Sequence, residues 1–161
     1  MLQDYYWKEF YRLKVHSRYV SLLHRDSEEK DRAIKILTAL ASSSSIGAWA
    51  VWKELGPLWG SIIAGSQVLN AIRPYLPYKK RLESLLSLAH ELEELAINTE
   101  MKWLDISSGD LSDEEEIKKA INDVKMRKQK ILKKHLPDTQ TPEDIPLLEK
   151  AEDDILQYVS T

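Results

Sequence analysis

Two neighbouring stretches without charge lie near the middle of the chain and decide how its fold is interpreted. Residues 36–52 read ILTALASSSSIGAWAVW, and residues 55–72 read LGPLWGSIIAGSQVLNAI. A single Lys-Glu pair separates them, and the Gly56-Pro57 sequence that follows is typical of a turn. Each stretch is close to the roughly 17–25 residues that a transmembrane helix needs. We therefore expect a central hydrophobic helical hairpin, which is either a two-transmembrane unit or the core of a soluble bundle.

The charges beside the hairpin favour the membrane interpretation. Basic residues lie within about 20 residues of both its ends, namely Arg18, Arg25, Lys30, Arg32 and Lys35 before it and Arg73, Lys79, Lys80 and Arg81 after it. The turn between the stretches carries only Lys53, beside Glu54. Because cytoplasmic loops carry the excess of Lys and Arg, this pattern places both termini in the cytoplasm.

Polar side chains within the hairpin are costly against lipid. In a membrane they would face a helix partner or a polar pore, and they are therefore the predicted polar lining: Ser42, Ser43, Ser44, Ser45, Gln67 and Asn70. In a soluble protein the same stretches would pack as a buried hairpin through their small residues. The sequence leaves both alternatives open.

An aromatic amphipathic helix is predicted for residues 1–26. Apolar side chains recur there at the three- and four-residue steps of one helical face, and Asp26 or Ser27 is expected to cap a new helix. Several aromatic side chains around the apolar stripe, and a tryptophan from a later helix, are the candidates for a protein interface: Trp7, Phe10, Tyr11 and Trp103.

Residues 77–136 predict a long antiparallel helix pair. The first of these helices has a heptad seam that runs from Leu82 to Ile106. After a polar loop, Ser112 and the acidic residue three positions later form a capping box for the second helix. A shorter helix is expected at 141–159. With the hairpin at 27–73, the chain is predicted to be a single all-α domain, a helical bundle over residues 1–161.

The order of these parts carries a family resemblance. An aromatic, basic helix leads into two hydrophobic helices, and a helix rich in Leu and Glu follows (RLESLLSLAHELEELAINTEMKWLDI, residues 81–106), then a partner helix. Over about residues 5–135 this architecture resembles the SLATT class of bacterial two-transmembrane effectors. The resemblance implies a membrane-perturbing or pore-forming effector of anti-phage defence in the bacterial inner membrane. Such a protein would act as a homo-oligomer or with a protein partner, and the class brings no catalytic residues.

No motif points to an enzyme. The sequence has no cysteine, and the position four residues after His90, where a metalloprotease helix needs a second histidine, is Glu94. We therefore predict no catalytic, cofactor-binding or metal-binding residues and no cofactor. The net charge of −3 argues against nucleic acid as a partner. The alternative function is a soluble, cytoplasmic adaptor or inhibitor with the hairpin as its core.

Overall fold

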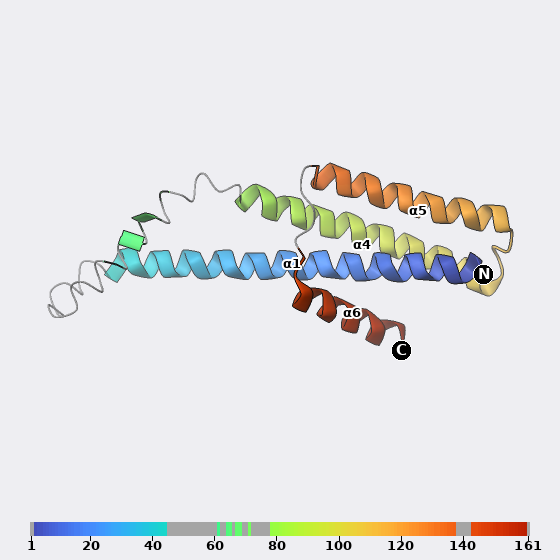
Figure 1. Ribbon diagram of the computed structural model, residues 1–161, viewed down its shortest axis with the longest axis horizontal. Coiled ribbons are helices and arrows are strands. Elements are labelled where there is room, and N and C mark those ends of the chain that lie inside the picture. Colours follow the sequence, from blue (N-terminus) through green and yellow to red (C-terminus); the bar gives the residue numbers. More distant parts are fainter. Residues whose placement is uncertain are drawn as a thin grey trace. The chain divides into compact units, whose positions relative to one another are not determined.

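The computed structural model confirms the all-α fold class for the residues that it describes, which are 2–44, 61, 64–65, 67–68, 71, 78–137 and 143–160. All regular elements in these ranges are α-helices (Figure 1). The chain divides into two compact units. The first combines Met1–Arg25 with Glu83–Thr161, and the second is Asp26–Leu82. Within the predicted hairpin, residues 45–60 and most of 62–73 lie outside the described residues.

The first helix, α1 (Leu2–Ser44), is longer than the sequence predicted. The break expected near Asp26 is wrong, because the helix continues through it. Asp26 pairs with Lys30 at 2.6 Å, and Asp31 pairs with Lys35 in the same way. Pairs with this spacing join successive turns of a helix and so favour its continuation over a cap. The boundary between the two compact units still falls at this point of the sequence.

Helix α4 (Tyr78–Ser108) runs antiparallel to the N-terminal part of α1 (Figure 1). The Gln3 side-chain amide donates a hydrogen bond to the Ile106 carbonyl over 3.4 Å. The Tyr6 hydroxyl donates to the carbonyl of Thr99 over 3.1 Å. The residue number on α4 therefore falls as the residue number on α1 rises, which is the order of an antiparallel pair. The segment 26–82 therefore leaves and re-enters the first unit at the same end.

The heptad seam predicted for α4 is largely buried. Six of its members are under 9% exposed: Leu85, Ala89, Leu92, Ala96, Thr99 and Ile106. Leu88 and Leu95, which flank the seam, are buried as well. Most of these side chains belong to one apolar cluster with residues of α1, with Val124 of the next helix and with Ile155 of the last. The seam therefore packs within the chain.

Helix α5 (Glu114–His135) forms the expected antiparallel partner of α4. The connecting loop passes through Gly109, whose φ of +87° is accessible to glycine at no steric cost. The predicted cap at Ser112 is one residue early. Asp113 has the extended backbone of a cap, and its carboxylate accepts a hydrogen bond from the Glu115 N–H over 3.2 Å.

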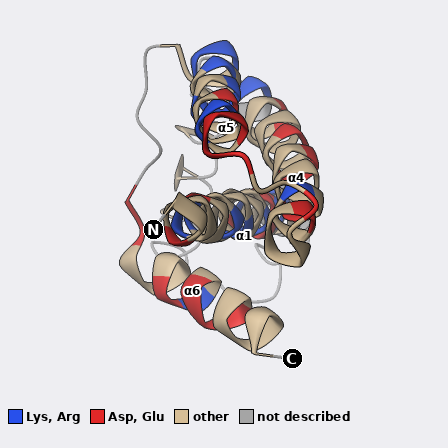
Figure 2. Cartoon of the chain, turned by 90° about the vertical axis from the view of Figure 1, so that its right-hand side faces the viewer, with Lys and Arg blue, Asp and Glu red and all other residues tan. Residues whose placement is uncertain are grey.

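The last helix, α6 (Ile145–Val159), begins four residues later than the predicted 141 and ends at the predicted residue, with Asp144 as its cap. It lies on the opposite side of α1 from α5 (Figure 2). Its Ala151 and Ile155 side chains are buried. The Tyr19 hydroxyl of α1 accepts a hydrogen bond from the Asp144 N–H over 2.9 Å, which fixes the start of α6 on α1.

Removing the Tyr6 hydroxyl tests how much the stability of the α1–α4 contact depends on a polar group in the core. The Tyr6 side chain is buried, and burial, with smaller effects of Asp105 and Asp123, raises its pKa to about 12, so the hydroxyl remains a donor. Replacing Tyr6 with Phe removes one buried hydrogen bond, and we expect a loss of about 1 kcal/mol in the free energy of unfolding. Chemical denaturation followed by circular dichroism measures it. The half-buried Tyr11, replaced in the same way, is the control and should change little.

Candidate functional site

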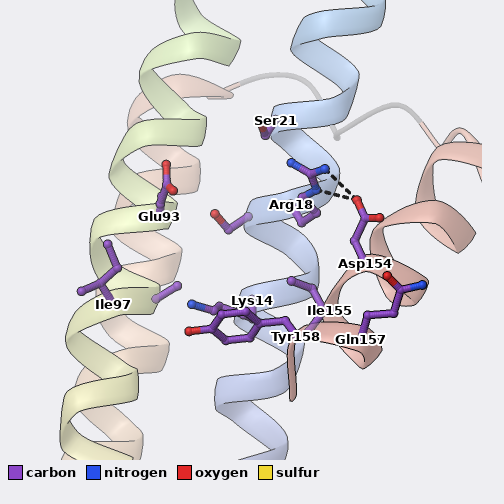
Figure 3. A pocket seen from close by; sticks show the side chains of 11 residues that line it. Lys14, Arg18, Ser21, Glu93, Ile97, Asp154, Ile155, Gln157 and Tyr158 are labelled. Carbon is purple, nitrogen blue, oxygen red and sulfur yellow. Dashed lines mark hydrogen bonds and ion pairs between the residues drawn. The ribbon is translucent and has the colours of Figure 1, made fainter. Parts of the chain in front are cut away.

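An open pocket of about 370 Å³ lies between α1, α4 and α6 (Figure 3). Four polar side chains of α1 line it at three- and four-residue steps, so they share one face of the helix: Lys14, Ser17, Arg18 and Ser21. The opposite wall contains the apolar side chains of Ile97 on α4 and Ile155 on α6. Charged and polar side chains of α4 and α6, such as Glu93 and Asp154, line it as well, so all three helices contribute polar groups to the pocket.

Ion pairs and hydrogen bonds in and beside this pocket attach α6 to α1 and α4. The Arg18 guanidinium donates through two nitrogens to one oxygen of Asp154, each at 2.7 Å (Figure 3). The Lys14 ammonium and the Tyr158 hydroxyl each donate to Glu100, also at 2.7 Å. Partial burial alone would raise the pKa of Glu100, but these two hydrogen bonds outweigh it and lower the pKa. The polar groups therefore hold α6 in place.

The lining of the pocket does not assemble a catalytic group. Its eleven residues include neither histidine nor cysteine, so Ser17 and Ser21 have no imidazole base beside them. Within the described ranges, no cluster of three His, Cys, Asp or Glu side chains has the geometry of a metal site.

A second hollow surface runs between α4 and α5. It consists of two adjoining hollows of about 730 and 540 Å³, which share Leu95, Asn98 and Arg127 in their linings. At one end, Glu91 of α4 accepts hydrogen bonds from Lys134 at 2.5 Å and from His135 at 2.9 Å. These two contacts lower the pKa of Glu91. They also determine which turns of α4 and α5 lie side by side.

The structure brings three of the four predicted interface residues together and places Tyr11 elsewhere. Trp7 packs against Trp103, with ring centroids 5.2 Å apart, and against Phe10 at 5.4 Å. Phe10 is only 2% exposed, so it is a core residue that a partner cannot reach. Tyr11 lines a different hollow, beside His16. Trp7, Tyr11 and Trp103 are half-buried, and their role in an interface stays a prediction.

The predicted polar lining of the hairpin is mostly beyond what the structure describes. Ser45 and Asn70 lie outside the described residues, and so do the side chains of Ser42, Ser43 and Ser44 at the end of α1. Gln67 is described and exposed. Across the helical segments that the structure describes, none has the length and apolarity needed to cross a membrane.

Comparison with known proteins assigns no family or function to this chain. No protein-family model matches the sequence, and neither the curated proteins nor the solved structures contain a significant match to it. The proposed function therefore rests on the chain's own residues.

His16 gives a prediction for pH dependence. Burial, with a smaller contribution from the charge of Lys128, lowers the pKa of His16 from its ordinary 6.5 to about 4. Between these values the unfolded chain binds the proton that the folded chain excludes, so stability falls as the pH drops from 6.5 toward 4. Urea unfolding at pH 7 and at pH 4.5 measures this loss. His16→Gln should reduce the difference between the two pH values. An unchanged difference would contradict the assignment, and His90→Gln, at an exposed position, is the matched control.

Proposed function

We propose that this chain is a non-enzymatic membrane protein that inserts the hairpin of residues 36–72 into a bilayer. The observation that supports this most directly is the antiparallel pairing of α1 and α4. It brings residue 25 and residue 83 to one end of the first unit, so the segment between them begins and ends on the same side. This arrangement is compatible with a two-helix hairpin whose ends are both cytoplasmic.

Exposed apolar side chains support the same proposal. Ile36 and Leu37 on α1, where the first uncharged stretch begins, are 53% and 66% exposed. Apolar surface of this kind is costly in water and is covered when a helix enters lipid. The basic residues just before this stretch, such as Arg32 and Lys35, would then meet the anionic headgroups of the cytoplasmic leaflet.

The resemblance to the SLATT class extends the proposal to a biological role. The protein would be an effector of bacterial anti-phage defence, located in the inner membrane, that perturbs the membrane or forms a pore as a homo-oligomer. The helices of the first unit would serve as a cytoplasmic scaffold and would not act on a substrate. Their paired charges and closed apolar core are consistent with such a role.

Fractionation of cells that express the full chain tests the membrane location. We expect the protein to remain in the membrane pellet after a carbonate wash, because inserted helices resist extraction at high pH. The control replaces residues 36–72 with a Gly/Ser linker. This variant should move to the soluble fraction. If the unmodified chain is soluble without detergent, the membrane proposal is wrong.

The predicted polar lining is tested by membrane depolarisation. Gln67→Leu combined with Asn70→Leu removes two polar groups that a water-filled path would need, and we expect ion flux to fall severalfold. Val68→Leu, beside them at an exposed position, is the control. Unchanged flux with the same amount of protein in the membrane would rule out these two residues as pore lining.

A soluble adaptor or inhibitor is the second candidate. Ile145 and Leu156 on α6 are 66% and 55% exposed, and a protein partner would cover them. The fractionation experiment decides between the two candidates, since this alternative predicts a soluble chain.

A further inference from the structure

An open apolar hollow of about 210 Å³ lies where α6 meets α1. Four apolar or aromatic side chains form its floor and walls: Tyr11, Val15 and Tyr19 of α1 and Leu148 of α6. Leu148 is 41% exposed, and Ile145 and Leu156, at helical spacing on the same flank of α6, are 66% and 55% exposed. In the part of the chain that the structure describes, this flank of α6 therefore presents apolar surface to solvent.

The α6 side of the hollow is negatively charged. Glu152 lines the hollow, and it lies between Leu148 and Leu156 in a row of side chains with four-residue steps. Glu149 is exposed about one turn earlier, and Figure 2 shows acidic residues along α6. Among the described residues, neither of these carboxylates has a hydrogen-bond or ion-pair partner. Both are therefore available to an opposite charge from another molecule.

Arg12 makes the α1 side of the hollow positively charged, with a side chain that is 70% exposed. Its contact with Glu9 is long, at 3.5 Å, and Glu9 is shared with Lys125 at 3.6 Å. Lys8, one turn before Arg12, is exposed and has no hydrogen-bond or ion-pair partner within the described ranges. Burial lowers the pKa of His16 to about 4, so this neighbour is neutral at pH 7. The hollow therefore separates a basic side on α1 from an acidic side on α6.

This face is complementary to itself. A partner that covers it must present an apolar strip with a base on one side and an acid on the other, at the same level. Arg12 and Glu152 line one hollow, so they lie at about the same level along α1. Turning a second copy by half a turn about an axis parallel to α1 exchanges the two sides and keeps the level. The chain's own face therefore meets these requirements, as an isologous contact demands.

We propose that two copies of this chain associate through this face, about a two-fold axis parallel to α1. Arg12 of each copy then faces Glu152 of the other, and the apolar flanks of the two α6 helices cover each other. Tyr11, which the sequence predicted for an interface, lies within this contact. Both copies point in the same direction, as two chains inserted into one membrane with one topology must. The inference deepens the homo-oligomer of the proposed function and rests on it.

Cross-linking through a single added cysteine tests this contact, because the full-length chain contains no cysteine. In a two-fold contact, a residue near the axis meets its own counterpart in the other copy. Leu148→Cys lies in the hollow, and we expect a short bismaleimide to join two full-length copies. Gln157→Cys, on the flank of α6 that lines the pocket of Figure 3, is the matched control and should remain monomeric. Equal yields from the two variants, or no dimer from Leu148→Cys, would overturn the proposal and leave the face to a different protein.

Charge reversal provides an independent test in the Leu148→Cys background. Arg12→Glu or Glu152→Arg places like charges at both equivalent contacts of the dimer. Each should lower the dimer yield about fivefold, the size expected for the loss of two exposed ion pairs. Lys150→Glu, at an exposed position on another flank of α6, is the control and should leave the yield unchanged. Circular dichroism should show the same helix content in all variants.

Mixing the two reversed copies distinguishes a contact between chains from one within a chain. The copy with Arg12→Glu has acids on both sides of its hollow, and the copy with Glu152→Arg has bases on both sides. With different epitope tags on the two copies, we expect mixed dimers to form in preference to either like pair. An ion pair within one chain predicts no such preference. Random pairing of the two copies would therefore overturn the proposal.

The results separate this inference from the proposed function. A chain that stays in the washed membrane without specific cross-links retains the membrane proposal and overturns the contact. A soluble chain that cross-links as described retains the contact and overturns the membrane location.

Discussion

The packing of α1 against α4 is the constraint on which the rest of the first unit depends. Leu13 and Val20 of α1 and Leu88 and Leu92 of α4 are at most 1% exposed, which makes this contact the centre of the apolar cluster. The two segments are separated in sequence by residues 26–82. Closing so long a segment costs only modestly more entropy than closing a short one, so the apolar contact can support a large insertion.

The other two helices attach to this pair by different means. Helix α5 follows α4 through a short loop and contributes apolar side chains such as Ile117 and Ile121 to a second cluster with Tyr6. Helix α6 has two buried side chains, and paired charges such as Arg18 with Asp154 complete its contact with α1. Partly exposed ion pairs stabilise less than buried apolar surface. We therefore expect α6 to open more easily than α5.

Periodic features of the sequence predicted most of the fold, and features that depend on distant contacts were missed. The α4 seam repeats every three or four residues, so its burial was predictable. The break near residue 26 was predicted from capping residues alone, although the Asp26–Lys30 spacing could have indicated continuation. The Arg18–Asp154 pair joins positions 136 apart, and no local pattern signals it. Phe10 was assigned to an interface because aromatic composition alone does not distinguish a core ring from an exposed one.

The contact between Glu91 and Lys134 determines which turns of α4 and α5 lie side by side. Lys134 and His135 of α5 approach Glu91 of α4 to hydrogen-bonding distance and lower its pKa. Glu94 and Lys130 continue the same two rows one turn further on. Both line the same open hollow between α4 and α5, and the structure describes no hydrogen bond or ion pair between them. The contacts of Glu91 with Lys134 and His135 therefore set the level of α5 on α4, and the next acid and lysine along this groove leave the hollow open.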